Sequence, residues 1–496
     1  MDQATPVLNP PQLSEREIRT ILAGILLAML LAALDQTIIA TALPTIGREL
    51  GDVEHLPWVV TVYLLTSTAV TPLYGKFSDS HGRRITMLIG IVVFIIGSIA
   101  CALAPTMLTL VLARGLQGIG GGGLIALGQT IIADLVSPRE RAKYQVYFAS
   151  VFMTSSLVGP VLGGFFAEHL HWSVIFWINL PLGLLAYVIS HRTLKKLPRF
   201  DRPTELDLLG AALLMGATVS LLLALSWGGV RHPWASVQIL GLVAGSAVLW
   251  GLFAARMRSA REPLIPPGVL HNPVVRMGTL AACFGMGTYI GLTIYLPVYF
   301  EAVRHLSASL SGLALIPLMV GTVVGATISG RVMTYMTHYK RLPLVGLTLA
   351  IAGTLVLALF ADRLSILAIE GVLAFLSIGL GTLLPVSTVA IQNAVRPHEL
   401  GTATGAANFF RSLGGAFIVA IFGAIVLGAS GLAGRMSSLE DLSAVAARSG
   451  IDLGDIFRYV FAVAALGFAL ALVFLWRMKE LPLRGGSQAA AAALAD

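Results

Sequence analysis

Charged side chains are scarce in this sequence. Asp, Glu, Lys and Arg make up 12% of its 496 residues, whereas soluble globular domains carry about 25%. Hydrophobic residues make up 56% and the mean hydropathy is +0.84, so the chain has more apolar surface than a soluble core can bury. Stretches that alternate apolar and polar residues are also missing, which excludes an outer-membrane barrel. The sequence therefore predicts a helical protein that is solvated mainly by lipid.

Cysteine and catalytic motifs are equally scarce. The two cysteines, Cys101 and Cys283, fall in apolar runs, which excludes a disulfide framework and a cysteine metal cluster. His169 and His171 stand alone in a short loop, where such a pair is usually solvated. Nucleotide-binding, GxSxG and HExxH motifs do not occur, and the run Gly120 to Gly123 lacks the Lys-Ser/Thr of a phosphate loop, so we interpret it as a close-packing helix face. We expect no enzyme activity, no metal and no cofactor.

Fourteen apolar segments are each long enough to cross about 30 Å of hydrocarbon as a helix. The predicted fold is an all-α membrane protein, a bundle of 14 transmembrane helices. The segments lie at 20–46, 57–77, 85–104, 107–134, 143–167, 172–191, 207–227, 236–255, 274–300, 308–334, 342–361, 364–390, 401–428 and 457–477.

Positive charge indicates how these segments are oriented. Most of the 33 Lys and Arg fall in the tails and loops on one side of the fourteen spans, and cytoplasmic loops carry such an excess. The bias places both termini in the cytoplasm and requires an even number of spans. It also explains the net charge of +8 without nucleic acid as a partner. The Ala-, Gly- and Leu-rich composition, with more Arg than Lys, favours a bacterial cytoplasmic (inner) membrane.

Two pairs of similar loops indicate an internal repeat. Gly75-Lys76 after span 2 corresponds to Gly330-Arg331 after span 10, and the charged turn at Pro138 after span 4 corresponds to that at Pro397 after span 12, at nearly equal separations. Parallel repeats are typical of transporters whose substrate site lies between two halves. The predicted domains are a tail, a six-helix half, a basic linker, two inserted helices, a second linker, a six-helix half with an outer loop at 429–456, and a tail: 1–19, 20–191, 192–206, 207–255, 256–273, 274–477 and 478–496.

The loop after span 2 carries the pattern G-x-x-x-D-x-x-G-R-R from Gly75 to Arg84. It resembles the loop signature of the major facilitator superfamily. Segments in spans 1, 4, 5 and 6 resemble the 14-helix drug:proton antiporter family of that superfamily, a group of multidrug exporters: LDQTIIATALP at 34–44, RGLQGIG at 114–120, GPVLGG at 159–164, and Trp172 with FWINLPLG at 176–183. The resemblance covers nearly the whole chain and implies a major-facilitator-type bundle of two six-helix halves plus two inserted helices.

The same resemblance implies that the loop motif is a cytoplasmic gate. In the family such an aspartate, here Asp79, meets the positive N-terminal end of span 13, near Gly401, and closes the cytoplasmic side. A simpler interpretation is that Lys76, Arg83 and Arg84 only set the topology. It leaves Asp79 unexplained, because acids add nothing to that signal. The predicted gate residues are Gly75, Asp79, Gly82, Arg83 and Arg84.

Asp35 is the leading candidate for proton coupling. An acid at the bilayer centre costs about 2.5–3.5 kcal/mol, so we expect it to face a cavity or a partner. The helical rise places Asp35 in span 1 level with Arg114 in span 4, and Gln117 lies one turn further along. We predict that Asp35 carries the proton, that Arg114 tunes its release and that Gln117 orients the network. A permanent structural Asp35–Arg114 ion pair is the alternative.

Glu370 in span 12 lies at a similar predicted depth. It could attract cationic drugs or take a second proton, and we include it among the proton-coupling residues. The alternative is a solvated side chain near the outer vestibule.

Span 5 contains Gly159, Pro160, Gly163 and Gly164, the segment that the family treats as its antiporter motif. Pro160 removes one backbone hydrogen bond and permits a kink, and the glycines permit close helix approach. Static packing is the alternative to a role in closure.

Aromatic and polar side chains are candidates for the lining of a substrate cavity between spans 1, 4, 9 and 12. Aromatic residues at helical spacing also occur as ordinary packing, and a pairing or packing role for Arg411 is equally open. The candidates are Tyr63, Phe152, Phe284, Tyr289, Tyr295, Asn408 and Arg411.

These observations predict a proton-coupled secondary exporter, an antiporter that moves small amphipathic and preferably cationic drugs or toxic compounds across the cytoplasmic membrane. Its expected partners are substrates, protons and the lipid bilayer, and the proton gradient replaces a cofactor. We expect a monomer, although the sequence leaves an oligomer open. The alternatives are a dedicated exporter of an endogenous metabolite or lipid, and a non-transporting sensor on the same fold.

Overall fold

The computed structural model describes residues 14–52, 55–197, 207–336, 338–429 and 452–483. Within these ranges the chain forms helices and no strand, and fourteen helical segments are long and apolar enough to cross a membrane. Each overlaps one of the fourteen segments predicted above. This confirms the predicted all-α bundle of 14 spans. The predicted tails, the basic linker and the loop 429–456 lie largely outside the described residues.

Local sequence fixes where helices begin. The Ser14 hydroxyl accepts a hydrogen bond from the Glu17 backbone N–H, and the Glu17 carboxylate accepts one from the Ser14 backbone N–H. This reciprocal capping satisfies two N–H groups that have no partner within the helix. Asn272 caps a later helix by accepting from the Val274 nitrogen at 2.9 Å through its Oδ1, and Pro273 occupies the first helical position, where its missing N–H costs nothing.

The first half of the bundle contains six spans in eight helices. α1 packs against α6 and α8, α2 packs against α4, and α3 packs against α4 and α8. The helices are α1 (Glu15–Leu50), α2 (Leu56–His81), α3 (Arg83–Ala102), α4 (Met107–Gly121), α5 (Leu124–Leu135), α6 (Pro138–His169), α7 (Val174–Trp177) and α8 (Asn179–Thr193).

The second half repeats this pattern. α12 packs against α18 and α20, α14 packs against α16, and α15 packs against α16 and α20, so the packing of each span matches that of its counterpart in the first half. Parallel repeats produce this equivalence. The helices are α12 (Pro273–Ala302), α13 (Ala308–Leu313), α14 (Ile316–Val332), α15 (Arg341–Phe360), α16 (Ile366–Gly381), α17 (Leu383–Asn393), α18 (Leu400–Ala429) and α20 (Leu453–Arg477).

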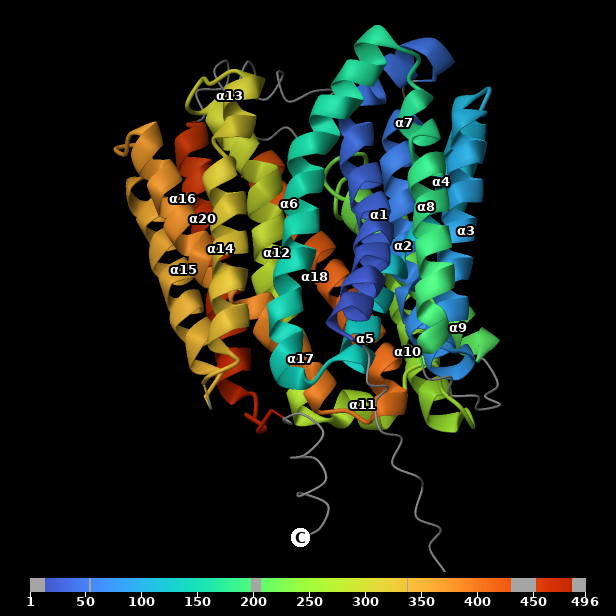
Figure 1. Ribbon diagram of the computed structural model, residues 1–496. Coiled ribbons are helices and arrows are strands. Elements are labelled where there is room, and N and C mark those ends of the chain that lie inside the picture. The colour runs from blue at the N-terminus through green and yellow to red at the C-terminus, as the bar shows by residue number, and fades with distance from the viewer. Residues whose placement is uncertain (1–13, 53–54, 198–206, 337, 430–451, 484–496) are drawn as a thin grey trace, which may run out of the picture.

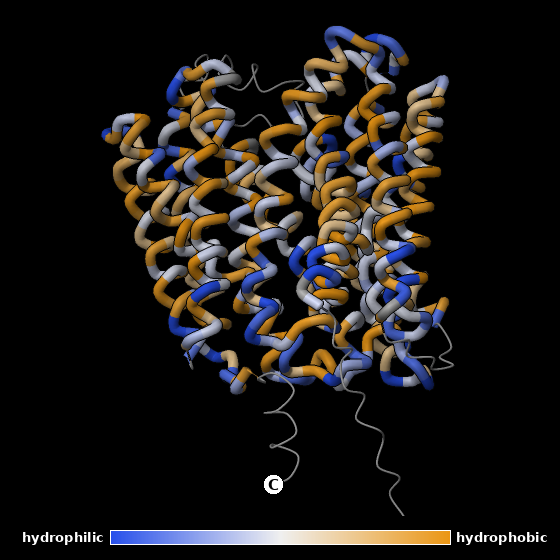
Figure 2. Tube along the Cα trace, viewed as in Figure 1, coloured by the Kyte–Doolittle hydropathy of each residue, from blue (hydrophilic) through white to orange (hydrophobic). Residues whose placement is uncertain are grey.

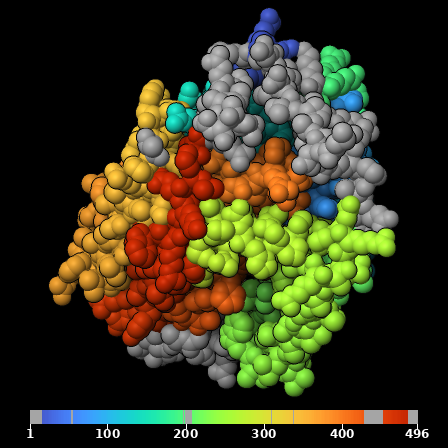
Figure 3. All heavy atoms as spheres, turned by 90° about the horizontal axis from the view of Figure 1, so that it is seen from below, coloured from blue at the N-terminus to red at the C-terminus, as the bar shows by residue number. Residues whose placement is uncertain are grey.

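The two halves meet along two seams, α2 against α18 and α6 against α14. The inserted helices α9 (Leu208–Trp227) and α10 (Val237–Ser259) pack against each other, and α9 packs against α2 and α18. The connection from α10 through α11 (Pro267–His271) then crosses one end of the molecule before α12 begins (Figure 3). The inserted pair therefore covers the α2/α18 seam.

The bundle has two distinct ends. The start of α1 and Leu483, the last described residue, lie at the same end of the bundle (Figure 1). We call this end the terminal end and the opposite end the distal end. Hydrophilic residues gather at both ends, and hydrophobic residues cover the flanks between them (Figure 2). This distribution is what a lipid-embedded bundle requires.

Spans 4 and 12 are each interrupted near their middle. Span 4 breaks between α4 and α5 at Gly122 and Gly123, and span 12 breaks between α16 and α17 at Thr382. The glycine run in span 4, interpreted above as a close-packing helix face, does provide close packing, because a Cβ at Gly122 would lie 2.2 Å from the Ser67 carbonyl oxygen. The helix nevertheless stops within the run.

Candidate transport site

A buried polar cluster surrounds Asp35 on α1. Arg114 Nη1 on α4 lies 2.5 Å from Asp35 Oδ2, and Gln117 Nε2 lies 2.7 Å from Asp35 Oδ1. Asn179 Nδ2 on α8 lies 3.1 Å from the same Oδ1. The Ser98 hydroxyl on α3 accepts from both amides. Four helices of the first half thus hold one carboxylate, whose residue is only 1% exposed.

Arg114 is held at several points at once. Its Nε donates to the Val59 carbonyl at 3.0 Å and its Nη1 donates to Gln117 Oε1 at 2.6 Å. The guanidinium also lies 4.3 Å from the centroid of the Tyr63 ring, a cation–π distance. Removing one partner of such a buried pair leaves an uncompensated charge and costs about 3–5 kcal/mol. The cluster is therefore a rigid unit as long as Asp35 is charged.

The cluster lies inside the first half and not between the halves. We expected Asp35 to be level with Arg114 and to face a cavity or a partner. In this conformation it is level with Arg114 and faces polar partners, Arg114, Gln117 and Asn179, and not the cavity. Asn179 and Ser98 were missed as members of the site. The available signal was the occurrence of an amide and a hydroxyl within apolar spans, where unpaired polar groups are costly.

A cavity of ≈ 470 Å³ lies in the distal half of the bundle, between the two halves. Its wall comes from α1, α2, α9, α12 and α18, and it extends to the loop after α9. Gln36, the chain neighbour of Asp35, is part of this wall. The lining is Gln36, Thr61, Leu64, Leu65, Ser67, Thr68, Leu222, Leu225, Ser226, Gly228, Val230, Ile290, Ile294, Tyr295, Ser412, Gly415, Ala416, Val419, Ala420, Gly423 and Ala424.

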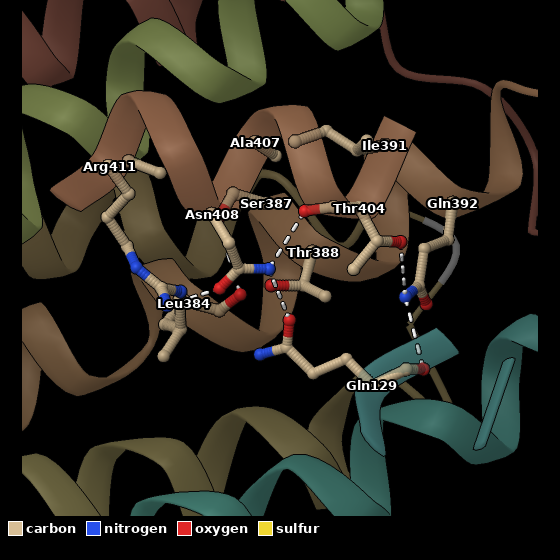
Figure 4. A pocket seen from close by; sticks show the side chains of 11 residues that line it. Gln129, Leu384, Ser387, Thr388, Ile391, Gln392, Thr404, Ala407, Asn408 and Arg411 are labelled. Atoms are coloured by element: carbon tan, nitrogen blue, oxygen red, sulfur yellow. Dashed lines mark hydrogen bonds between the residues drawn. The ribbon is translucent and has the colours of Figure 1, made fainter. Parts of the chain in front are cut away.

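A much smaller pocket of ≈ 20 Å³ lies nearer the terminal end, between α5, α12, α17 and α18. We call it the inner pocket. Asn408 Nδ2 donates to Gln129 Oε1 at 2.8 Å, which joins the halves, and Gln392 Nε2 donates to the Gln129 carbonyl at 3.3 Å (Figure 4). The lining is Gln129, Ala282, Leu384, Ser387, Thr388, Ile391, Gln392, Thr404, Ala407, Asn408 and Arg411.

The predicted cavity residues divide into two groups. Tyr295 lines the distal cavity, and Asn408 and Arg411 line the inner pocket. The others lie elsewhere: Tyr63 under Arg114, Phe284 stacked on Phe474 of α20, Tyr289 partly buried against the core of the second half, and Phe152 exposed on α6 outside both linings. Helical spacing alone does not separate these positions, because packing and lining residues share the same period.

Glu370 does not join the Asp35 cluster. It lies one turn into α16, half-buried, and it lines neither the distal cavity nor the inner pocket. Its similar predicted depth therefore did not bring it to the same place as Asp35.

Asp79 joins the two halves at the terminal end. Its carboxylate accepts from the Gly401 and Thr402 nitrogens at 2.9 and 2.7 Å and from the Thr402 hydroxyl at 2.7 Å. Arg83 Nη1 lies 2.5 Å from Asp79 Oδ1, and Arg83 Nε lies 2.7 Å from Asp134 Oδ2. An aspartate at a helix N-terminus is favoured by the positive end of the helix dipole. These five residues form what we call the Asp79 latch.

The sequence analysis placed Asp79 at the start of span 13 but missed Asp134, an acid within the last turn of span 4. Gly75 permits the approach, because a Cβ there would lie 2.4 Å from the Gly401 carbonyl oxygen. Gly82 has a φ of 91°, which side chains rarely adopt. Arg84 contacts a different element: its Nε donates to the His191 carbonyl on α8 at 3.3 Å.

The glycines of span 5 bring α1 and α6 together. A Cβ at Gly159 would lie 2.0 Å from Thr37 Oγ1, and one at Gly163 would lie 2.1 Å from the Ile38 carbonyl oxygen. Nothing lies within 4 Å of a Cβ at Gly164. α6 continues through Pro160 without a break, and the Pro160 carbonyl accepts from Thr41 at 3.3 Å.

Residues 25–419 match the Major Facilitator Superfamily. The chain belongs to this family. The match spans most of both halves and the inserted pair, in agreement with the resemblance seen in the motifs. This major facilitator is therefore a membrane transporter, and members of the family are generally not enzymes.

Relatives of this major facilitator include transporters named for drug efflux. It is 34% identical over 414 residues to the multidrug transporter protein MdtP of Bacillus subtilis, which covers 83% of this chain and 76% of the relative. It is 34% identical over 405 residues to multidrug resistance protein 3 of the same organism, which covers 82% of this chain and 79% of the relative. Among solved structures, the proton:xylose symporter XylE has a TM-score of 0.66 at 16% identity, with 97% of this chain and 100% of that chain covered, which supports the fold alone.

Proposed function

We propose that this transporter is a proton-coupled antiporter that exports amphipathic compounds across the cytoplasmic membrane in exchange for protons. The observation that carries the proposal is the buried Asp35 carboxylate on the helix that also lines the distal cavity. Asp35 accepts hydrogen bonds from Arg114, Gln117 and Asn179, whereas Gln36, the next residue, lines the cavity. The relatives named for multidrug efflux support the export of drugs or toxic compounds.

Coupling follows from the electrostatics of the cluster. With Asp35 charged, Arg114 is neutralised and the helices that hold the pair are locked together. With Asp35 protonated, the ion pair is lost, and the buried guanidinium favours an arrangement in which it finds other partners or water. A proton on Asp35 therefore changes the relative energy of two arrangements of the first half, and a switch requires such a difference.

The conformation fits one stage of that cycle. The Asp79 latch and the Gln129–Asn408 contact close the terminal side, while the distal half contains a cavity of ≈ 470 Å³. If the terminal end is cytoplasmic, as the charge distribution predicts, the structure faces outward, the stage in which protons enter and substrate leaves.

The proton gradient is a sufficient energy source. One proton that moves down about 100 mV releases about 2.3 kcal/mol, which supports a roughly fiftyfold gradient of a neutral substrate. Glu370 was a candidate for attracting cationic drugs. Because this residue lines neither cavity, the proposal covers amphipathic compounds as a class.

The test is exchange in proteoliposomes with an acidic lumen, using ethidium and pyrenebutyrate as an amphipathic cation and an amphipathic acid. We expect at least one probe to enter only with the pH gradient and to release luminal protons, followed with a trapped pH dye. Asp35→Asn should abolish both signals. Glu49→Gln, an exposed acid on the same helix, should leave them unchanged. Full proton release by Asp35→Asn would contradict the role of Asp35, and no response of the folded wild type to either probe would contradict multidrug export.

A further inference from the structure

Arg411 is a membrane-embedded cation without an acidic partner. It lies on α18 about 16 Å along the helix from Leu400, which is close to the middle of a 30 Å hydrocarbon layer. Its Nη2 donates to Asn408 Oδ1, a neutral amide. Within the described part of the chain no carboxylate lies within 4 Å of it. By contrast, Arg83 and Arg114 each form ion pairs with aspartates.

The two cavities contain no other charge. Among the residues that line the distal cavity and the inner pocket, Arg411 is the only charged side chain, and no acid is present. A cation in a low-dielectric site attracts anions and repels cations. The surface that a substrate meets between the halves is therefore net positive, and this disfavours cationic substrates.

One face of α18 connects the two cavities. Thr404, Asn408 and Arg411 line the inner pocket, and Gly415 and Val419 continue the same face into the distal cavity at intervals of three or four residues, the spacing of one helical face. Arg411 is the last inner-pocket residue before the distal cavity begins. A molecule whose acid group lies at Arg411 therefore extends along this face toward the distal cavity.

The neighbours of Arg411 suit an anionic head group. Thr388 and Thr404 supply hydroxyl groups and Gln129 supplies an amide, whereas the Ser387 hydroxyl already donates to the Leu384 carbonyl. Asn408 holds the guanidinium from one side (Figure 4). This contact restricts the Arg411 side chain in the free protein, so less conformational entropy is lost when an anion binds. The guanidinium presents several donors in one plane, which matches a carboxylate, sulfonate or phosphate.

We propose that Arg411 binds the acid group of amphipathic anionic substrates during export. The proposal rests on the proposed antiport function and specifies its substrate class. In the present conformation the inner pocket of ≈ 20 Å³ has room for about one water molecule. The acid group therefore binds at Arg411 in the terminal-open conformation, once Gln129 of the first half has separated from Asn408. Closure of the terminal side then returns the pocket to its present size and moves the substrate along α18 into the distal cavity.

The first test is calorimetric binding to the full-length purified protein, with pyrenebutyrate and its uncharged counterpart pyrenebutanol. We expect the acid to bind at least about tenfold more tightly than the alcohol, as for a charge-assisted hydrogen bond. Arg411→Gln should remove this preference, and Arg411→Lys should restore most of it. Arg363→Gln, an exposed arginine at the distal end of the second half, is the matched control and should bind like the wild type.

Equal binding of acid and alcohol by the wild type, or equal weakening of both by Arg411→Gln, would overturn the proposal. A thermal-unfolding measurement on each variant shows whether a loss of binding reflects a loss of the fold. Arg411→Lys is a second control, because it keeps the positive charge at the site. Failure of the antiport function has a different signature. Arg411-dependent binding of pyrenebutyrate without any uptake in response to a pH gradient would support the anion site and contradict proton-coupled export.

Discussion

Asp35 and Gln36 are adjacent in α1 but lie in different surroundings. Asp35 is buried against Arg114 within the first half, whereas Gln36 lines the distal cavity between the halves. A single helix therefore joins the interior of one half to the wall of the cavity. A movement of α1 that accompanies protonation of Asp35 is transmitted to the cavity without any intervening element.

Replacing Arg114 with Lys should damage the cluster although the charge is kept. A lysine cannot reach the Val59 carbonyl, Gln117 and Asp35 together, because its ammonium is a point charge on a flexible stem. We expect a loss of about 3–6 kcal/mol of stability from two missing charge-assisted hydrogen bonds, measured as a lower thermal-unfolding midpoint, together with impaired proton exchange. Arg231→Lys in the loop after α9 serves as the control. An unchanged midpoint would show that the cluster does not depend on the guanidinium.

Asp79→Asn should favour the terminal-open conformation. The neutral amide loses the charge-assisted hydrogen bonds to Gly401 and Thr402 and the ion pair with Arg83. A loss of about 1–2 kcal/mol changes the ratio of closed to open states by about five- to thirtyfold. The rate at which a maleimide labels a cysteine at Ala407, in the inner pocket, should rise accordingly.

This labelling experiment needs a background in which Cys101 and Cys283 are replaced by Ala, so that only the introduced cysteine reacts. Asp52→Asn at the distal end is the control and should leave the rate unchanged. If Asp79→Asn labels no faster than its parent, the latch contributes nothing to closure of the terminal side.

Two adjacent glycines in α6 should respond oppositely to alanine. At Gly163 the added Cβ would lie 2.1 Å from the Ile38 carbonyl oxygen, which belongs to the α1 backbone and cannot move aside easily. We expect a destabilisation of about 1–3 kcal/mol, as for other overpacking substitutions. At Gly164 there is open space, so alanine should be neutral or stabilising by up to about 1 kcal/mol. Thermal unfolding of the two variants compares them directly, and equal midpoints would contradict the close α1/α6 contact.

The proposed anionic substrates predict a response to membrane potential. Export of one monoanion in exchange for one imported proton moves two charges in the same electrical direction, whereas exchange of a monovalent cation for a proton moves none. Each charge gains about 2.3 kcal/mol per 100 mV. A lumen-positive potassium diffusion potential should therefore accelerate pyrenebutyrate uptake into acidic vesicles and leave any ethidium uptake unaffected. Pyrenebutyrate uptake at a rate independent of the membrane potential would contradict the exchange of one monoanion for one proton.

The fold was predictable because lipid imposes a simple rule on sequence. A helix in hydrocarbon must be about 20 apolar residues long, and all fourteen segments found in this way overlap helices of the structure. The breaks within spans 4 and 12 were not predicted. Small and polar residues such as Gly122 and Thr382 also occur inside continuous helices, so sequence alone does not show where the backbone hydrogen-bond ladder stops.

The site was predictable only along single helices. Depth from helical rise placed Asp35 level with Arg114, and the same calculation placed Glu370 at a similar depth, but only the first pair is in contact. Depth gives one coordinate, and rotation about each helix and the packing partners supply the others. Asn179 and Ser98 complete the cluster from α8 and α3. The local sequence does not predict how these two helices are rotated about their axes.

The inserted helices make the two sides of the transporter unequal. α9 packs against α2 and α18 and forms part of the distal cavity wall, while the α6/α14 seam has no such cover among the described helices. The inserted helices therefore separate the α2/α18 seam from the lipid, whereas the α6/α14 seam contacts the lipid directly. Amphipathic compounds that enter directly from the membrane would reach the transporter at the α6/α14 seam.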